Sequence, residues 1–146
     1  MPDTYSKRHI KSTITAGSVY YFHEKSIGSP KQHNFIVINV DPSKDTLIFL
    51  VCSSTQIEYF RKLRKNCPGK TLVEITPIQY SGFSEKSIID CNHIFPKNID
   101  EIARMLSKNK LQIKPVMGLR LVKQLRQGVI LSPQVANEIK MLLQTD

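Results

Sequence analysis

The chain has 146 residues and carries 21 Lys and Arg against 12 Asp and Glu, which gives a formal net charge of +9 at pH 7. Its apolar fraction of 40% and charged fraction of 23% are close to the averages of folded domains and exclude wholesale disorder. The excess of positive charge favours a polyanionic partner: nucleic acid first, then an acidic protein, then an anionic membrane surface.

The expected compartment follows from features that the sequence lacks. No apolar run approaches the roughly 20 residues of a membrane-spanning helix, and residues 1–17 are too polar for a secretory signal. Cys52, Cys67 and Cys91 form no CxxC pair, which argues against a disulfide framework and against a zinc site. We therefore expect a cytoplasmic protein with no membrane contact, no bound metal and no cofactor.

The first two thirds of the chain are predicted to form short strands. Residues 1–15 lack periodicity and are basic, so we expect a flexible arm ahead of one domain over 16–146. The first three strands are joined by loops too short for crossover helices, so their pairing is expected to be antiparallel. Five such strands suit a small barrel or a strongly bent sheet. The strand signals cover 18–23, 33–40, 46–53, 71–77 and 87–95.

Helical periodicity replaces the strand pattern in the last third of the chain. Asn98 followed by Glu101 resembles a capping box and begins the first helix. A second apolar stripe over 116–125 is expected to end at Gly128, and Ser132 with Pro133 is expected to begin a third helix. Strands followed by helices predict an α+β fold, with strands in 16–97 and helices in 98–146. The outer faces of these helices carry Arg120, Lys123 and Arg126 among other cations.

Hydroxyls and cations stand side by side in residues 51–65, VCSSTQIEYFRKLRK. A phosphodiester suits both kinds of group, because its oxygens accept neutral and charge-assisted hydrogen bonds. No acid after Glu58 in this segment offsets the charge, so we expect an anion-binding surface. Tyr59 and Phe60 are predicted either to stack on bases or to face the core, and we weigh the two evenly. The cations are Arg61, Lys62, Arg64, Lys65 and Lys70.

A second basic cluster precedes the strand at 33–40 and consists of His23, Lys25, Lys31 and His33. A metal-free ribonuclease needs a base for the 2′-hydroxyl, an acid for the leaving oxygen and a cation against the phosphorane. Histidine and lysine can supply all three. A single histidine in a basic protein is more often a surface residue, so the signal lies in the cluster.

Residues 90–93, DCNH, bring three potential ligands or catalytic groups together in sequence. Strand alternation puts Cys91 and His93 on one face and Asp90 and Asn92 on the other. We expect a structural strand end with an inert thiol, while a cysteine nucleophile paired with a distant histidine stays open.

The order of these features resembles the MazF/PemK family of toxin-antitoxin ribonucleases, which are small SH3-like barrels. AGSVYYF resembles the opening strand of the family, GSPKQHNFIVIN its loop and following H-R-P-x-V-V strand, and FLVCSSTQ its central strand with a hydroxyl cluster. The similarity covers about residues 16–95. It implies an antiparallel SH3-like barrel and metal-independent cleavage of single-stranded RNA.

The resemblance also implies site residues, with one departure from the family pattern. The catalytic hydroxyl falls on Ser53, with Ser54 and Thr55 as alternatives if the register shifts. The family has an arginine directly after His33, for phosphate stabilisation and acid-base chemistry, where this chain has Asn34. An amide does not supply that charge. Lys31 and His33 are the candidate replacements, although alternation places residues 33 and 34 on opposite faces.

The leading hypothesis is a toxin-like protein that binds single-stranded RNA between the loop at 25–33 and the segment 53–65. If it cleaves RNA, His33 acts as acid or base and Ser53 donates a hydrogen bond to phosphate. The alternative is a catalytically silent domain whose basic face binds an acidic, antitoxin-like protein; homodimer formation stays open. The predicted nucleic-acid-binding residues are Lys25, Lys31, Asn34, Ser54, Thr55, Arg61, Lys62, Arg64 and Lys65.

Overall fold

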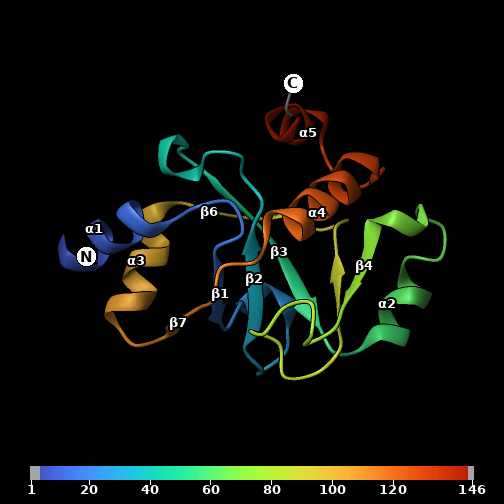
Figure 1. Ribbon diagram of the computed structural model, residues 1–146, viewed down its shortest axis with the longest axis horizontal. Helices are drawn as coiled ribbons and strands as arrows, with labels where there is room; N and C mark the ends of the chain where they lie inside the picture. Colours follow the sequence, from blue (N-terminus) through green and yellow to red (C-terminus); the bar gives the residue numbers. More distant parts are fainter. Residues whose placement is uncertain (1–3, 145–146) are drawn as a thin grey trace.

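The computed structural model describes residues 4–144 (Figure 1). The predicted α+β class is confirmed: an antiparallel sheet lies between helices on both of its faces. No helix in the described part is long and apolar enough to cross a membrane. The strands are β1 (Val19–Phe22), β2 (His33–Val37), β3 (Ile48–Ser54), β4 (Leu72–Ile75), β5 (Ser87–Asp90), β6 (Phe95–Lys97) and β7 (Leu111–Lys114). The helices are α1 (Thr4–Thr13), α2 (Ile57–Leu63), α3 (Ile99–Ser107), α4 (Leu119–Leu131) and α5 (Asn137–Leu143).

The sheet is bent around its longest strand, β3. The strand order is β4-β5-β3-β2-β1-β7, and every pair is antiparallel, as expected. On the side away from β2, residues 48–50 of β3 pair with β6 and residues 53–54 pair with β5. One edge of β3 therefore serves two partners in succession. Among the described residues β4 and β7 do not pair with each other, so the sheet stays open and is not the closed barrel that was expected.

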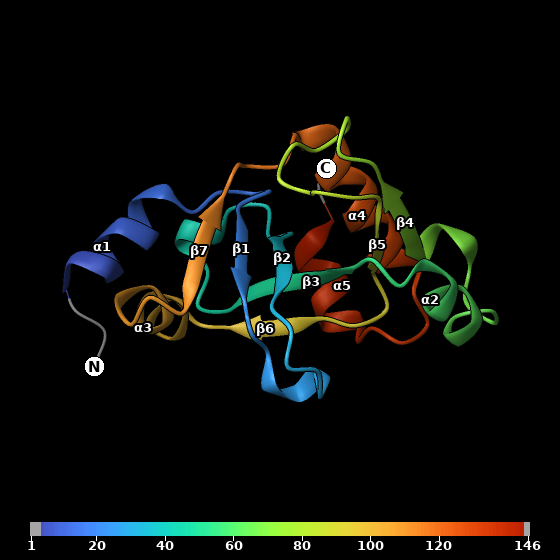
Figure 2. The same ribbon diagram turned by 90° about the horizontal axis from the view of Figure 1, so that it is seen from below.

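Each face of the sheet is covered by its own apolar core. Because alternate residues of a strand face opposite sides, Val51 points toward α4 and α5, whereas Leu50 points toward α1 and α3. The first core contains Val19, Ile36, Val51, Val122, Leu125, Val129 and Leu143, and the second contains Ile10, Phe22, Phe35, Leu50, Ile102 and Ala103. Figure 2 shows these layers from a second direction. The ends of β2 and β3 are thereby held in fixed positions.

The N-terminal segment differs from the flexible arm expected over residues 1–15. Residues 4–13 form α1, which packs on α3; residues 1–3 lie outside the described part. Ile10 is fully buried in the second core, and the Lys7 ammonium lies 3.0 Å from the Asp100 carboxylate. The segment looked unstructured in the sequence because its mostly polar helix offers Ile10 alone as a buried apolar residue.

The C-terminal helices agree with the sequence at one boundary and differ at two. The capping box is confirmed, since the Glu101 amide donates to the Asn98 side chain at 2.8 Å and the Asn98 amide donates to Glu101 at 3.1 Å. Gly128 does not end a helix but lies inside α4, where a Cβ would stand 2.7 Å from the Lys70 carbonyl oxygen. α5 begins at Asn137 rather than at Ser132.

Besides α1, three elements and one side chain were not foreseen from the sequence. The single strand predicted over 87–95 divides into β5 and β6. β7 lies between the first two C-terminal helices, and α2 occupies the basic stretch after β3. Arg126 does not belong to the outer face of its helix: it is buried, and its guanidinium donates to the carbonyl oxygens of Ile38 at 2.7 Å and Asn39 at 3.1 Å. It therefore ties α4 to the end of β2.

Candidate functional site

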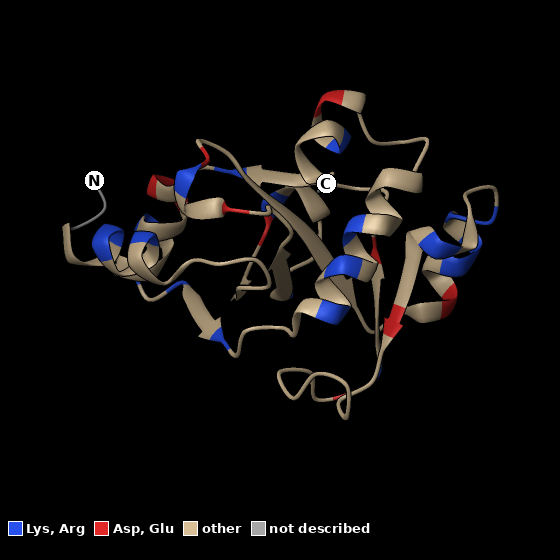
Figure 3. Cartoon of the chain, turned by 45° about the horizontal axis from the view of Figure 1, so that its top comes forward, with Lys and Arg blue, Asp and Glu red and all other residues tan. Residues whose placement is uncertain are grey.

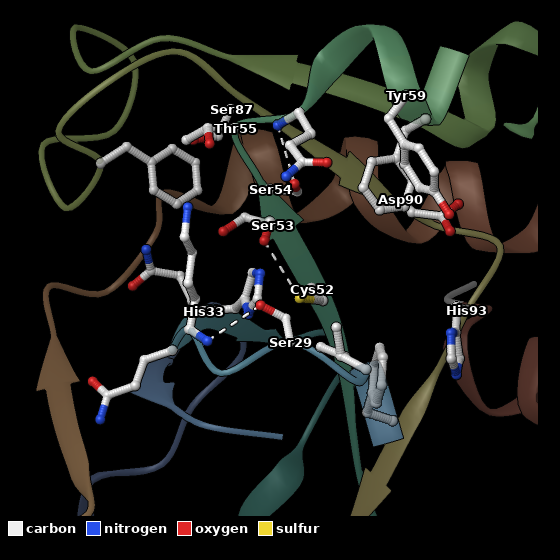
Figure 4. Close-up of a pocket in the computed structure, with 18 of the residues that line it drawn as sticks. Ser29, His33, Cys52, Ser53, Ser54, Thr55, Tyr59, Ser87, Asp90 and His93 are labelled. Carbon is white, nitrogen blue, oxygen red and sulfur yellow. Dashed lines mark hydrogen bonds between the residues drawn. The ribbon is translucent and has the colours of Figure 1, made fainter. Parts of the chain in front are cut away.

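A pocket of about 550 Å³ lies at the carboxyl end of β3, and we call it the β3 pocket (Figure 4). Its walls are the loop between β1 and β2, the end of β3, α2, the loop between β4 and β5, and the segment around His93. Seven of the residues expected to form the site line it: Lys31, His33, Asn34, Ser53, Ser54, Thr55 and Arg64. Four do not: Lys25, Arg61, Lys62 and Lys65.

The pairing of β2 with β3 brings the two distant halves of the predicted site together. Phe35 pairs with Cys52 in antiparallel register, so the start of β2 lies beside the end of β3. His33 and Asn34 therefore line the same pocket as the hydroxyl cluster that begins at Ser53, and Figure 4 shows His33 beside Ser53. Both residues line the pocket, although alternation directs neighbouring residues of a strand to opposite faces of the sheet.

The hydroxyls of the pocket are largely uncommitted. Ser53 is only 4% exposed, yet its hydroxyl makes no hydrogen bond with any residue of the described chain. The exposed Thr55 hydroxyl has no such bond either within residues 4–144. The Ser54 hydroxyl differs, because it accepts a hydrogen bond from the Gln56 amide at 3.1 Å. Ser53 and Thr55 can therefore donate to a ligand without losing a bond within the protein.

Aromatic rings form a large part of the pocket wall. Tyr59 is 56% exposed and lies edge-on to Phe60, with 5.1 Å between the ring centroids. Both rings line the pocket. Across the pocket His93 stacks on Phe95 at 4.1 Å, and Phe83 enters from the loop between β4 and β5. The aromatic residues of α2 thus face this cavity and belong to neither apolar core.

The surroundings of His33 favour the neutral form of its imidazole. Burial lowers the pKa of His33 below its ordinary value of 6.5; a hydrogen bond with the Lys31 backbone opposes this shift, and the charges of His23 and Lys31 add to it. Nδ1 of His33 is buried without a hydrogen-bond partner, and so is Oδ1 of Asn34. A neutral imidazole can accept a proton, which is the property a general base needs.

Arg61 and Arg64, the two arginines of the basic stretch, form ion pairs with Glu74 of β4 and Asp90 of β5. Arg64 donates from Nε and Nη2 to Asp90 at 3.1 and 2.8 Å, and the two side chains are 18% and 7% exposed. Arg61 binds Glu58 and also Glu74 of β4, the latter at 2.6 Å. No acid of residues 59–65 offsets this charge in the sequence, but Glu74 and Asp90, from other segments, approach it in the folded sheet. Figure 3 shows the basic residues of α2 beside the acidic residue of β4.

The lysines near the pocket carry the charge that remains available. Lys25, Lys31, Lys62 and Lys65 are exposed and form no ion pair with a described residue. Only Lys31 of these four lines the pocket. The lining holds two cations, Lys31 and Arg64, against two acids, Glu85 and Asp90. The interior is therefore balanced in charge. Lys25, Lys62 and Lys65 each adjoin a lining residue in sequence, and we call these exposed neighbours of the lining the rim.

Cys52, Cys91 and the DCNH segment at residues 90–93 have structural roles in the fold. Burial raises the pKa of Cys52 to about 12 and also raises that of Cys91, so neither thiol is activated. Asn92 donates from Nδ2 to Asp90 at 2.9 Å and accepts from the Ser132 hydroxyl at 2.7 Å, which makes both residues part of a buried network. Within residues 4–144 no group of three or more His, Cys, Asp and Glu is placed to hold a metal ion.

Sequence reasoning missed several residues of the pocket. Phe83, Ser84 and Glu85 come from the loop between β4 and β5, and His93 follows β5. The loop carries no periodic pattern or motif that could have pointed to the site. His93 was noticed in the DCNH segment but was interpreted as a strand end, whereas its ring is exposed and lines the cavity.

The chain matches no family model, and no curated protein matches it. The geometry and chemistry of the β3 pocket and its rim are therefore the basis for inferring a function.

Proposed function

We propose that the chain is a toxin-like protein of the cytoplasm that binds single-stranded RNA at the β3 pocket. The observation that carries the proposal is the meeting of aromatic rings, uncommitted hydroxyls and Lys31 in one pocket with unpaired lysines at its rim. Bases of single-stranded RNA stack on aromatic side chains, and their phosphates are neutralised by cations. Both requirements are met within a few residues of β3.

The charge distribution suggests how a nucleotide divides between pocket and rim. The interior is balanced in charge and lined by rings such as Tyr59 and Phe83, so it suits a base and a ribose. The hydroxyls of Ser53 and Thr55 offer hydrogen bonds to the sugar or to a bridging phosphate. The lysines at the rim then neutralise the flanking phosphates.

A second candidate activity is cleavage of the bound RNA, favoured by the neutral state of His33 in the same pocket. In this scheme His33 takes the proton of a 2′-hydroxyl, and the oxygen attacks the adjacent phosphorus. The bond from phosphorus to the 5′-oxygen breaks, and that oxygen leaves with a proton supplied by water or by a second group. Ser53 donates a hydrogen bond to a non-bridging oxygen, and Lys31 opposes the negative charge of the phosphorane. The products are a 2′,3′-cyclic phosphate and a 5′-hydroxyl.

The toxin-like part of the proposal rests on the MazF/PemK resemblance over about residues 16–95. β1, β2 and β3 follow one another as antiparallel neighbours, and β3 serves two partners along one edge. We infer that this arrangement is an SH3-like barrel opened between β4 and β7. Asn34 still departs from the family pattern, and Arg64 does not replace the missing arginine because Asp90 binds it. Lys31 is left as the cation of the site.

Incubation of the purified protein with labelled single-stranded RNA in EDTA tests binding and cleavage together. We expect a shifted complex with the wild type and the two cleavage products named above. Ser53→Ala is expected to keep binding and lose cleavage, whereas Thr55→Ala, a matched loss of an uncommitted hydroxyl, is expected to keep both. Intact RNA in a stable complex reduces the protein to a binding module. No RNA binding, together with recovery of a stoichiometric acidic protein, favours the silent interaction domain instead.

A further inference from the structure

A second, shallower pocket of about 250 Å³ lies at the C-terminal end of α3, and we call it the α3 pocket. Four of its lining residues are basic, and only one is acidic. The lining consists of Lys97, Glu101, Arg104, Met105, Lys108 and Lys110. Glu101 belongs to the capping box of α3, and the proposed function assigns no role to the four cations.

The turn after α3 fixes the cations of this pocket around the cavity. Asn109 has a positive φ of 55°, the left-handed conformation that ends a helix. The Lys110 amide donates to the Met105 carbonyl at 2.8 Å, and the Asn109 amide donates to the Leu106 carbonyl at 3.1 Å. These two bonds are those of a Schellman motif, which folds the chain back over the last turn. Lys110 is therefore returned to the side of Arg104 and Lys108 by the backbone itself.

Three of the four cations that line the α3 pocket have no ion-pair partner in the described chain. Arg104, Lys108 and Lys110 form no ion pair with any residue between 4 and 144. Glu101 accepts the Asn98 amide in the capping box. Cations near a helix C-terminus interact favourably with the helix dipole, but this effect does not require them to surround a cavity. A cavity lined by three unpaired cations and a single acid suits a small, strongly charged anion such as a phosphate group.

The α3 pocket is next to the β3 pocket along β6. Phe95 lines the β3 pocket and Lys97 lines the α3 pocket, and two residues of a strand span about 7 Å. Figure 2 shows β6 running along β3, with which it pairs. A single strand of nucleic acid can therefore reach both pockets over a short distance.

The boundary between the pockets does not repel an anion. The Lys97 ammonium lies 2.7 Å from the Glu24 carboxylate, which also accepts from the hydroxyl of Ser26 at 2.6 Å. Glu24 is only 12% exposed, so its charge is both neutralised and covered. Burial raises the pKa of Glu24, but the hydrogen bonds from Lys97 and Ser26 outweigh it, and the pKa lies below its ordinary value. Ser26 belongs to the wall of the β3 pocket, so this pair joins the two sites.

We propose that the α3 pocket binds a phosphate of the same RNA strand that places a nucleotide in the β3 pocket. The inference rests on the proposed function and extends it to the path of the RNA, which runs over β6 toward the end of α3. The ligand class is a phosphodiester held by Arg104, Lys108 and Lys110.

The test compares two triple variants that remove the same charge from different places. Arg104→Gln with Lys108→Gln and Lys110→Gln empties the α3 pocket of unpaired cations. Arg120→Gln with Lys123→Gln and Lys140→Gln is the matched control, because these residues belong to α4 and α5, which cover the other face of the sheet. RNA affinity is measured over a range of salt with a single nucleotide, which serves as the short strand, and with a long strand of about 12 nucleotides.

We expect the α3-pocket variant to lower the slope of log affinity against log salt by about 0.7 for the long strand, which corresponds to one phosphate contact. The short strand, which fills only the β3 pocket, is expected to bind both variants with the same slope. Equal slopes for the two variants with the long strand overturn the inference while the proposed function stands. A wild type that binds neither strand removes the proposed function and this inference with it. If circular dichroism shows that the triple variant is unfolded, the exposed Lys108→Gln and Lys123→Gln single variants replace the pair, with the same criterion.

Discussion

The rim of the β3 pocket has two parts, the α2 segment and the loop between β1 and β2, and both are basic in the sequence. In the folded protein they differ in how their cations are paired. The α2 rim has the denser run of cations, yet both of its arginines are bound by carboxylates of β4 and β5. The rim formed by the loop between β1 and β2 has fewer cations, but Lys25 and Lys31 form no ion pair with a described residue. Charge density in a sequence therefore does not measure the charge available to a ligand.

The difference has a structural cause on the α2 side. Arg64 and Asp90 are largely buried, and the second oxygen of Asp90 accepts from Asn92. This pair holds α2 against β5 and thereby positions Tyr59 and Phe60 at the pocket. Removing one partner of a buried pair leaves an uncompensated charge, whereas an exposed pair such as Arg61 with Glu58 contributes little.

The largest expected effect is on stability and follows from the pairing of Arg64. Asp90→Ala is expected to lower the free energy of unfolding by about 3 kcal/mol, because it leaves the guanidinium without its partner in a largely buried position. Glu58→Ala, which removes an exposed carboxylate from Arg61, is expected to change it by less than about 1 kcal/mol. Urea denaturation measures both. Equal effects would show that the two arginines do not differ in their structural role.

A smaller effect is expected on RNA binding when the two lysines of α2 and its following turn are removed. Lys62→Ala with Lys65→Ala should lower the slope of log affinity against log salt by up to about 1.4, or about 0.7 for each phosphate contact. Replacing Arg61 and Arg64 as well should not double this decrease in slope, because both arginines are already neutralised by ion pairs. Arg120→Ala with Lys123→Ala on α4 is the control. A slope unchanged from wild type would mean that the α2 rim does not contact RNA.

The smallest effect concerns the pH dependence of stability. The pKa of His33 is lower in the folded chain than its ordinary value of 6.5, because burial disfavours the charged imidazole. Between the folded pKa and 6.5 the unfolded chain binds more protons, so stability is fully present above about pH 6.5 and declines as the pH falls toward the folded pKa. His33→Gln is expected to lack this decline. Urea denaturation at several pH values measures it, and parallel curves for the two proteins would refute the shift.

The fold was predictable where local patterns determine it. Strand positions up to β5, antiparallel pairing and the capping box at Asn98 all follow from periodicity and turn chemistry, which act over a few residues. β7 was missed because Gln112 and Ile113 are both exposed on this edge strand, so its residues do not alternate between buried and exposed. Gly128 was misassigned because its close approach to Lys70 and Cys91 is a tertiary contact.

The candidate site was predictable in composition but not in its electrostatics. The hydroxyls after β3 and the histidine before β2 were recognisable, because antiparallel pairing of these strands brings them together. The partners of Arg61 and Arg64 are 13 and 26 residues away in sequence, so no local window shows them. Glu85 and His93 reach the pocket through loop geometry, which leaves no pattern in the sequence.

The central claim is that unpaired lysines, and not the paired arginines, carry the contacts with phosphate. The most direct measurement is the salt dependence of affinity for a single-stranded RNA with Lys31→Ala and Arg61→Ala. Each variant removes one positive charge from an exposed side chain near the same pocket, but only Lys31 lacks an ion-pair partner in the described chain. The account predicts a slope lowered by about 0.7 for Lys31→Ala and a wild-type slope for Arg61→Ala. Equal slopes for the two variants, or a loss confined to Arg61→Ala, would contradict it.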